Sequence, residues 1–116
     1  MRHAQSTYNH AIRSPLTWLK PTFYFRGFDP GPKFIDARLS DVGLKQVESM
    51  RNKLIDLENS DQIFQKCDLI ITSPLSRAIQ TCLGVMKNNL NTKIIAHPGI
   101  KEVARSSCDI GRDVNE

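Results

Sequence analysis

The sequence predicts an α/β domain built around a largely parallel sheet, and three stretches carry this prediction. Residues 41–57 have the spacing of an amphipathic helix, residues 68–86 read as a strand followed by a helix, and residues 93–96 read as another short strand. The order helix, strand, helix, strand is typical of layered domains with parallel strands. A chain of 116 residues, 40% of them apolar, has material for one core, so a single domain is expected.

The first predicted helix begins after Ser40, whose hydroxyl group suits the capping position ahead of a first helical turn. The lysines and arginines of residues 45–53 are expected on a solvated face. On the other face, apolar residues recur every three or four positions: Leu44, Val47, Met50, Leu54 and Leu57. This stripe predicts that the helix packs against the rest of the domain.

The clearest structural signal is the strand and helix of residues 68–86. Leu69 to Ile71 form an apolar run that predicts a strand buried on both faces. Ser73 is the expected cap of the following helix, and Pro74 suits its first position because its φ angle is preset and no N–H group needs a partner there. The apolar face of this helix is expected to hold Leu75, Ile79, Cys82 and Met86.

Residues 12–35 differ from the rest of the chain. Prolines and glycines interrupt any regular element there: Pro15, Pro21, Gly27, Pro30, Gly31 and Pro32. Five of the eight aromatic residues of the chain also lie between residues 18 and 28. This composition predicts an irregular insertion, whose aromatic side chains either fold over the core as a flap or form an exposed surface for a protein partner or a substrate.

Composition also argues against several classes of protein. No run approaches the roughly 18 apolar residues of a membrane span, and the N-terminus lacks a signal-peptide core, so a cytoplasmic protein without membrane contact is expected. Cys67, Cys82 and Cys108 are odd in number and lack metal-ligand spacing, which predicts reduced thiols rather than disulfides or a zinc site. The net charge of +4 arises within residues 1–33, but no nucleic-acid-binding motif accompanies it, so no nucleic-acid partner is expected.

A few polar residues are placed where phosphate chemistry could occur. Arg77 falls in the first turn of a helix, where a cation is unfavourable unless an anion is bound nearby. The preceding strand ends at the carboxyl edge of a parallel sheet, where α/β proteins bind ligands. A neutral His3 could accept a phosphoryl group if Arg2 and Arg77 held its oxygens, and if Glu102 protonated the leaving oxygen.

Four short segments carry a resemblance to a known family. Residues 2–9 read Arg-His-Ala-Gln-Ser-Thr-Tyr-Asn, residues 39–46 read Leu-Ser-x-x-Gly-x-x-Gln, and residues 72–81 read Thr-Ser-Pro-Leu-Ser-Arg-Ala-x-Gln-Thr. In this order they resemble the signatures of the histidine phosphatases, the phosphoglycerate-mutase-like superfamily. Residues 101–112, with the run Cys-Asp-Ile-Gly-Arg, are similar to a plant and protist branch of it.

The resemblance implies a three-layer α/β sandwich that carries out phosphoryl transfer through a phosphohistidine, as a phosphatase or a phosphomutase. His3 would attack phosphorus, Arg2, Arg77 and Asn9 would bind its oxygens, and Glu102 would be the proton donor. The substrate would be a small phosphate monoester, with no metal or organic cofactor. The alternative is a catalytically inactive protein of the same fold that serves as a binding or structural subunit, with residues 12–35 as its protein-binding surface.

The chain also departs from the family pattern. Ala4 replaces a glycine, which is acceptable if its φ angle is negative, and Gln5 replaces a glutamate. Met1 stands where the family has its first strand, and the second histidine of the family would follow residue 116. Residues 1–116 are therefore expected to be the N-terminal portion of one such domain, with partly uncovered apolar faces and little turnover on their own.

Overall fold

The computed structural model describes residues 2–13, 32–61, 67–87, 92–103 and 107–111. Its helices are α1 (Thr7–Arg13), α2 (Asp41–Asp61) and α3 (Ser76–Val85), and its strands are β1 (Leu69–Thr72) and β2 (Lys93–Ala96). Three short 3-10 turns complete the described elements: η2 (Pro32–Phe34), η4 (Pro98–Ile100) and η5 (Ser107–Asp109). No helix within these residues is long and apolar enough to cross a membrane.

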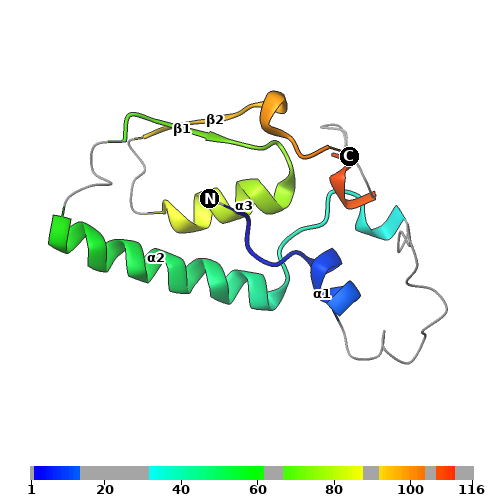
Figure 1. Ribbon diagram of the computed structural model, residues 1–116, viewed down its shortest axis with the longest axis horizontal. Coiled ribbons are helices and arrows are strands. Elements are labelled where there is room, and N and C mark those ends of the chain that lie inside the picture. Colours follow the sequence, from blue (N-terminus) through cyan, green and yellow to red (C-terminus); the bar gives the residue numbers. More distant parts are fainter. Residues whose placement is uncertain (1, 14–31, 62–66, 88–91, 104–106, 112–116) are drawn as a thin grey trace.

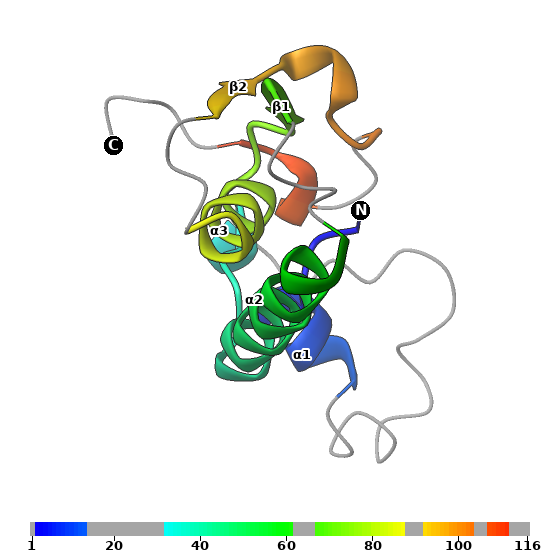
Figure 2. The same ribbon diagram turned by 90° about the vertical axis from the view of Figure 1, so that its left-hand side faces the viewer.

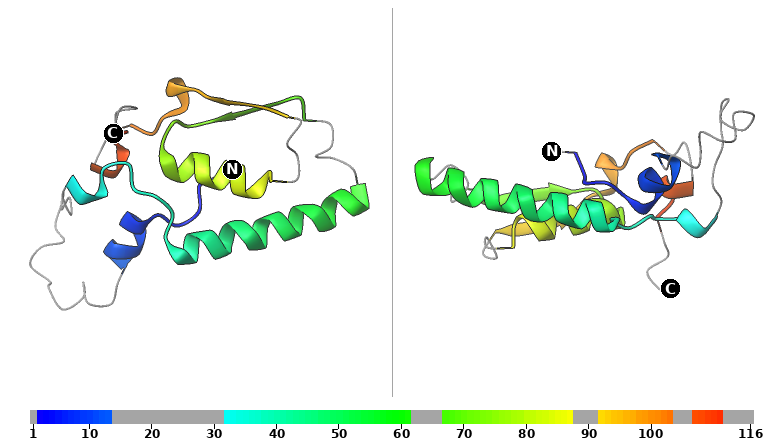
Figure 3. Two further views of the ribbon diagram at one scale, coloured as in Figure 1. Left: turned by 180° about the vertical axis from the view of Figure 1, so that it is seen from behind. Right: turned by 90° about the horizontal axis from the view of Figure 1, so that it is seen from below.

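The two strands form a parallel sheet, and α3 connects them. Leu69 lies opposite Lys93, and Thr72 lies opposite Ala96. Below the sheet α3 forms one layer and α2 the next, as Figure 1 shows and as the views in Figures 2 and 3 confirm. The predicted α/β class with parallel strands is thus confirmed, and the described helices α2 and α3 both lie on one side of the sheet.

Helix α2 begins where the sequence predicts, and the Ser40 cap is confirmed. The Ser40 hydroxyl oxygen accepts a hydrogen bond from the Gly43 N–H group over 3.1 Å. The helix then continues to Asp61, beyond the predicted end at Leu57. The extra turn, residues 58–61, contains no glycine or proline that would end the helix.

The buried stripe of α2 is narrower than predicted. Val47 is buried with Leu39 and Val85 in the core, and Leu54 packs against this cluster. Three other members of the predicted stripe are exposed instead: Leu44, Met50 and Leu57. Among the described helices and strands, α3 is the main packing partner of α2, and their contact is close, because a Cβ atom added at Gly84 of α3 would clash with the Val47 side chain.

The start of α3 corrects the prediction. The helix begins at Ser76. Leu75 occupies the N-cap position with an extended backbone, and its side chain makes no capping hydrogen bond. Ser73 accepts a hydrogen bond from the Leu75 N–H group over 3.4 Å and so belongs to the preceding turn. Asp36 acts as the cap instead, since its carboxylate accepts hydrogen bonds from the Ser76 N–H group over 2.7 Å and from the Ser76 hydroxyl group over 2.6 Å.

The prediction that β1 is buried on both faces is wrong. Its side chains alternate, and Leu69 and Ile71 are 44% and 54% exposed, whereas Thr72 is buried. Successive strand residues point to opposite faces of a sheet, and α3 covers only one of these faces. The expectation that the apolar faces are only partly covered is confirmed for the described residues.

Most of the predicted insertion, residues 14–31, lies outside the described residues, but its two ends are described. Residues 12 and 13 are helical rather than irregular, because α1 extends to Arg13. The Ser6 hydroxyl oxygen caps α1 by accepting from the Asn9 N–H group over 3.2 Å. The Tyr8 ring meets the Phe34 ring edge to face, with 5.9 Å between their centroids. Helix α1, which leads into the insertion, therefore contacts the far end of the insertion.

Candidate functional site

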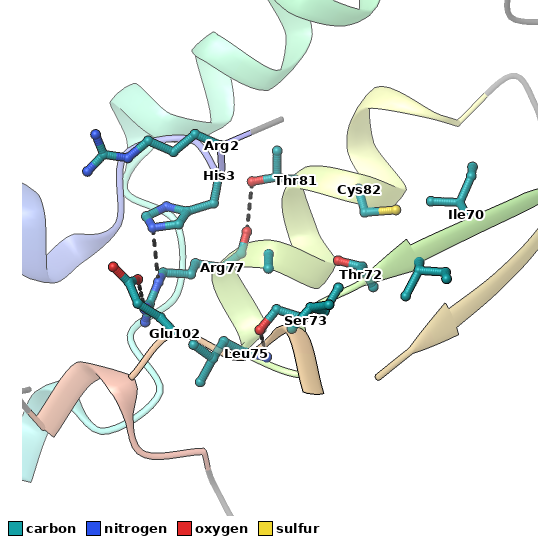
Figure 4. Close-up of a pocket in the computed structure, with 13 residues that line it drawn as sticks. Arg2, His3, Ile70, Thr72, Ser73, Leu75, Arg77, Thr81, Cys82 and Glu102 are labelled. Carbon is teal, nitrogen blue, oxygen red and sulfur yellow. Dashed lines mark hydrogen bonds and ion pairs between the residues drawn. The ribbon is translucent and has the colours of Figure 1, made fainter. Parts of the chain in front are cut away.

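A cavity of about 670 Å³ opens at the carboxyl edge of the sheet, as Figure 4 shows. Parallel strands bring the turn after β1 and the segment after β2 to the same edge, and the His97 N–H group extends the ladder by donating to the Thr72 carbonyl group over 2.9 Å. The lining residues come from the N-terminal segment, β1 and the turn after it, α3 and the segment after β2: Arg2, His3, Ile70, Ile71, Thr72, Ser73, Leu75, Arg77, Ala78, Thr81, Cys82, Ile100 and Glu102.

His3 and Arg77 contact each other in this cavity. The Arg77 Nε atom lies 3.2 Å from His3 Nε2, and His3 Nδ1 lies 2.7 Å from the Ala4 carbonyl oxygen. A guanidinium group can only donate and a carbonyl group can only accept, so these partners assign a neutral ring with its proton on Nδ1. The lone pair of Nε2 therefore accepts the Arg77 Nε–H group in this structure, and Nε2 is the unprotonated nitrogen of the ring.

Arg77 is the most densely paired side chain of the site. It is only 3% exposed, and its Nη2 atom lies 2.9 Å from Asp109 Oδ1 and 3.4 Å from Glu102 Oε2. Its Nη1 atom donates to the Cys108 carbonyl group. A buried arginine keeps its charge and needs such partners. The cation that the sequence places in the first turn of α3 is thus held by two carboxylates.

Of the other predicted site residues, Glu102 and Arg2 line the cavity and Asn9 does not. Glu102 is on the rim of the cavity with its side chain 65% exposed, as expected from the sequence. Arg2 lines the cavity but is exposed, and in Figure 4 its guanidinium group points away from Arg77. Asn9 lies in α1 and is not among the lining residues. The structure therefore brings together Arg2, His3, Arg77 and Glu102, and places Asn9 elsewhere.

The segment that carries His3 is fixed by residues of the second and third signature segments. The Ala4 N–H group donates to Thr81 Oγ1 over 3.1 Å, and the Gln5 N–H group donates to Gln46 Oε1 over 2.9 Å. Ser6 pairs with Leu39 through an isolated β-bridge. Figure 3 shows this blue segment running from beside α3 to the start of α2. The signature segments thus supply the hydrogen-bond partners that position the histidine.

Two small residues complete this support. Gly43 lies against the Gln5 backbone so closely that an added Cβ atom would clash with the Gln5 carbonyl oxygen. Ala4 packs against the core beside Leu39, Val47 and Val85. Among the described non-glycine residues, a positive φ angle occurs only at Asp36. Ala4 therefore meets the condition under which it can replace the usual glycine.

Sequence reasoning missed several residues of the site. It assigned no role to Asp109 or Asp36, which are both buried, and it used Thr81 only as part of a signature. The signal for Asp109 was the position of Arg77 in a first helical turn, where a cation needs a negative group nearby. No local signal identifies Asp36, since it lies 40 residues before the helix that it caps.

Cys82 lines the cavity beside Thr81 and is buried, as its place on the apolar face predicts. Burial raises the pKa of the Cys82 thiol, because an apolar environment disfavours the thiolate. The neutral thiol is a weak nucleophile. Cys82 therefore belongs to the wall of the cavity, and His3 remains its candidate nucleophile.

Comparison with known proteins gives one family. The sequence model of the histidine phosphatase superfamily (branch 1) matches residues 33–115, a range that includes Arg77 and Glu102. "Phosphoglycerate mutase-like protein 1" of Arabidopsis thaliana is 40% identical over 52 residues, which are 45% of this chain and 17% of that protein. "Phosphoglycerate mutase-like protein" of the same organism is 30% identical over 92 residues, 79% of this chain and 29% of that protein. The chain thus spans a minor part of each relative. No solved structure matches it significantly.

Proposed function

The chain belongs to the histidine phosphatase superfamily, and from this membership we propose that it transfers phosphoryl groups from small phosphate monoesters through a phosphohistidine on His3. One observation carries the proposal. The lone pair of His3 Nε2 and the Arg77 guanidinium group face each other across 3.2 Å inside one cavity. A nucleophile and a cation at this spacing can engage the phosphorus and an oxygen of one phosphoryl group.

The first step follows from the protonation state of His3. Nε2 attacks phosphorus, the N–P bond forms and the bond from phosphorus to the ester oxygen breaks. The Nδ1 proton stays on the ring and continues to donate to the Ala4 carbonyl group, which fixes the ring orientation. Once phosphate has displaced the Glu102 carboxylate from Arg77, the carboxylate takes up a proton from water at the exposed rim and donates it to the departing oxygen.

The phosphoryl oxygens must replace protein groups at Arg77. In the structure Glu102 holds Nη2 at 3.4 Å with a mostly exposed side chain, so this ion pair is the weak one. A phosphate dianion displaces Glu102 from Nη2 and takes over the Nε–H hydrogen bond from His3, which frees the Nε2 lone pair for phosphorus and leaves Glu102 close to the ester oxygen. Arg2 contributes a second positive charge at the mouth of the cavity.

The second step decides between a phosphatase and a phosphomutase. Attack of water on the phosphohistidine releases phosphate, whereas attack of a substrate hydroxyl group gives a new monoester. Both relatives carry "phosphoglycerate mutase-like" in their names, and the chain covers 17% and 29% of their lengths. The activity of the whole protein is therefore part of the proposal, as is the cytoplasmic location predicted from the sequence.

The alternative function is that of a catalytically inactive binding protein. One observation supports it. Apolar side chains gather on the outer face of β1, where Leu69 and Ile71 are exposed. Exposed apolar surface of this kind often marks contact with another polypeptide. The two functions differ in a simple property, because only the enzyme needs Nε2 of His3 to become phosphorylated.

The experiment is to trap the phosphohistidine. The protein is mixed with a radiolabelled aryl phosphate, quenched in alkali and digested, and the labelled peptide is identified by mass spectrometry. We expect acid-labile label on His3 in the wild type and none in His3→Ala, with His10→Ala as the matched control that keeps the label. Label that survives His3→Ala, or a wild type that is never labelled, would contradict the proposal.

A further inference from the structure

The Cys108-Asp109 pair is the one signature element to which the proposed function assigns no role. It forms η5, which lies beside η2 near the start of α3 in Figure 1. Both residues are buried, and both contact Arg77. We propose that Asp109 is a positioning residue, which holds the Arg77 guanidinium group in the orientation that aligns Nε with His3. The inference rests on the proposed function for its catalytic consequence, but not for its structural content.

The geometry at Arg77 supports this role. The guanidinium group is planar and rigid, so fixing two of its nitrogens fixes the direction of the third. Asp109 Oδ1 accepts from Nη2 over 2.9 Å, and the Cys108 carbonyl group accepts from Nη1. With both terminal nitrogens held by consecutive residues of η5, the Nε–H group is directed at His3 Nε2 over 3.2 Å.

The two carboxylates at Nη2 differ in burial and distance. The Asp109 side chain is 8% exposed and lies 2.9 Å away, whereas the Glu102 side chain is 65% exposed and lies 3.4 Å away. A buried, short pair is strongly coupled, and an exposed, longer pair exchanges easily with water or an anion. Asp109 is thus the permanent partner of Arg77, and Glu102 is the partner that a phosphate can replace.

A second buried carboxylate provides a matched control. Asp36 is as buried as Asp109 and also supports the start of α3, but it binds Ser76 rather than Arg77. Replacing either carboxylate by its amide removes one buried charge from the same region. Because asparagine can still cap the first turn of α3, only the change at Asp109 should alter the orientation of Arg77, so the pair separates positioning from a general structural effect.

The first measurement does not depend on activity. The Nε–H resonance of Arg77 is observed by ¹⁵N NMR and assigned by its loss in Arg77→Lys. In the wild type and in Asp36→Asn we expect a protected resonance and a His3 ring protonated on Nδ1. In Asp109→Asn we expect faster solvent exchange of this Nε–H group and a mixture of His3 tautomers. Should Asp109→Asn fail to fold, Asp109→Glu is used, which keeps the charge and shifts the carboxylate, and an altered resonance is again expected.

The second measurement is the rate of His3 labelling by the aryl phosphate. Misplacing a reacting group by about 1 Å can cost up to about 100-fold, so labelling should slow by about 10- to 100-fold in Asp109→Asn and by less than about 3-fold in Asp36→Asn. Equal Nε–H protection in the two variants would overturn the inference. If Asp109→Asn alone loses protection while the wild type is never labelled, the positioning role stands and the proposed function fails.

Discussion

The segments that bring His3 and Glu102 to Arg77 are built in opposite ways. The His3 segment is fixed on several sides, by Thr81, by Gln46 and by the β-bridge to Leu39. The Glu102 segment follows η4 at the surface, and its side chain is mostly exposed. The difference indicates a division of labour in which the nucleophile is held in place and the acid can adjust to a substrate.

The difference between the His3 and Glu102 segments predicts how substitutions change the free energy of unfolding. The largest decrease is expected at Arg77, which contacts both segments. Arg77→Met removes the cation that pairs with the buried Asp109, so the loss of this charged pair should lower the free energy of unfolding by about 3–5 kcal/mol. Chemical denaturation measures this change. Arg51→Met is the control, because Arg51 forms a longer pair, 3.7 Å, with the exposed Glu48 of the same helix. Equal effects of the two substitutions would show that Arg77 is not the anchor of the site.

A smaller effect is expected where α2 supports the fixed segment. In Gly43→Ala the new methyl group meets the Gln5 carbonyl oxygen, and backbone atoms cannot move aside easily, so a loss of about 1–3 kcal/mol is expected. The His3 ring should be displaced as well, which would slow its labelling. Gly111→Ala serves as the control, because no atom of the described residues lies within 4 Å of the place that its new methyl group would take. A stable, fully labelled Gly43→Ala protein would contradict the proposal that α2 holds the His3 segment in position.

The smallest change in the free energy of unfolding is expected in the Glu102 segment. Glu102→Gln removes an exposed ion pair, so the free energy of unfolding should change by less than about 1 kcal/mol. Phosphoryl transfer should slow by about 10²–10⁴-fold with an alkyl phosphate, whose leaving oxygen needs a proton. With an aryl phosphate, whose leaving group is stable as an anion, the change should be slight. An equal loss with both substrates would argue against the role of Glu102 as the acid.

Local patterns predicted much of the fold. The helix cap at Ser40, the strand of residues 93–96 and the parallel arrangement of the strands follow from spacing and side-chain type, which act over a few residues. The start of α3 did not follow, because its cap comes from Asp36, far away in sequence. The exposure of Leu44 and Ile71 was not predicted either, since periodicity shows which residues are apolar but not what covers them.

The site was predictable to a similar degree. The resemblance and the position of Arg77 identified four residues that line one cavity, and their catalytic roles stay predictions. Asn9 was assigned from its place in a signature, whereas the Ser6 cap that starts α1 carries it away from the cavity. Asp109 escaped notice because the need for a partner at Arg77 does not say which distant carboxylate meets it.

The cap at the start of α3 links the local opening of the Asp36 segment to that of the first turn of α3. Asp36 adopts a left-handed conformation with a φ angle of 48° and closes the first turn of α3 from 40 residues away. That turn carries Arg77. Native proteins open locally in cooperative units, and amide hydrogen exchange detects each opening. When the Asp36 segment detaches, the Ser76 amide loses its acceptor and exchanges with solvent, and the turn that holds Arg77 loosens in the same event. Hydrogen exchange at Ser76 therefore reports how often the resting site comes apart.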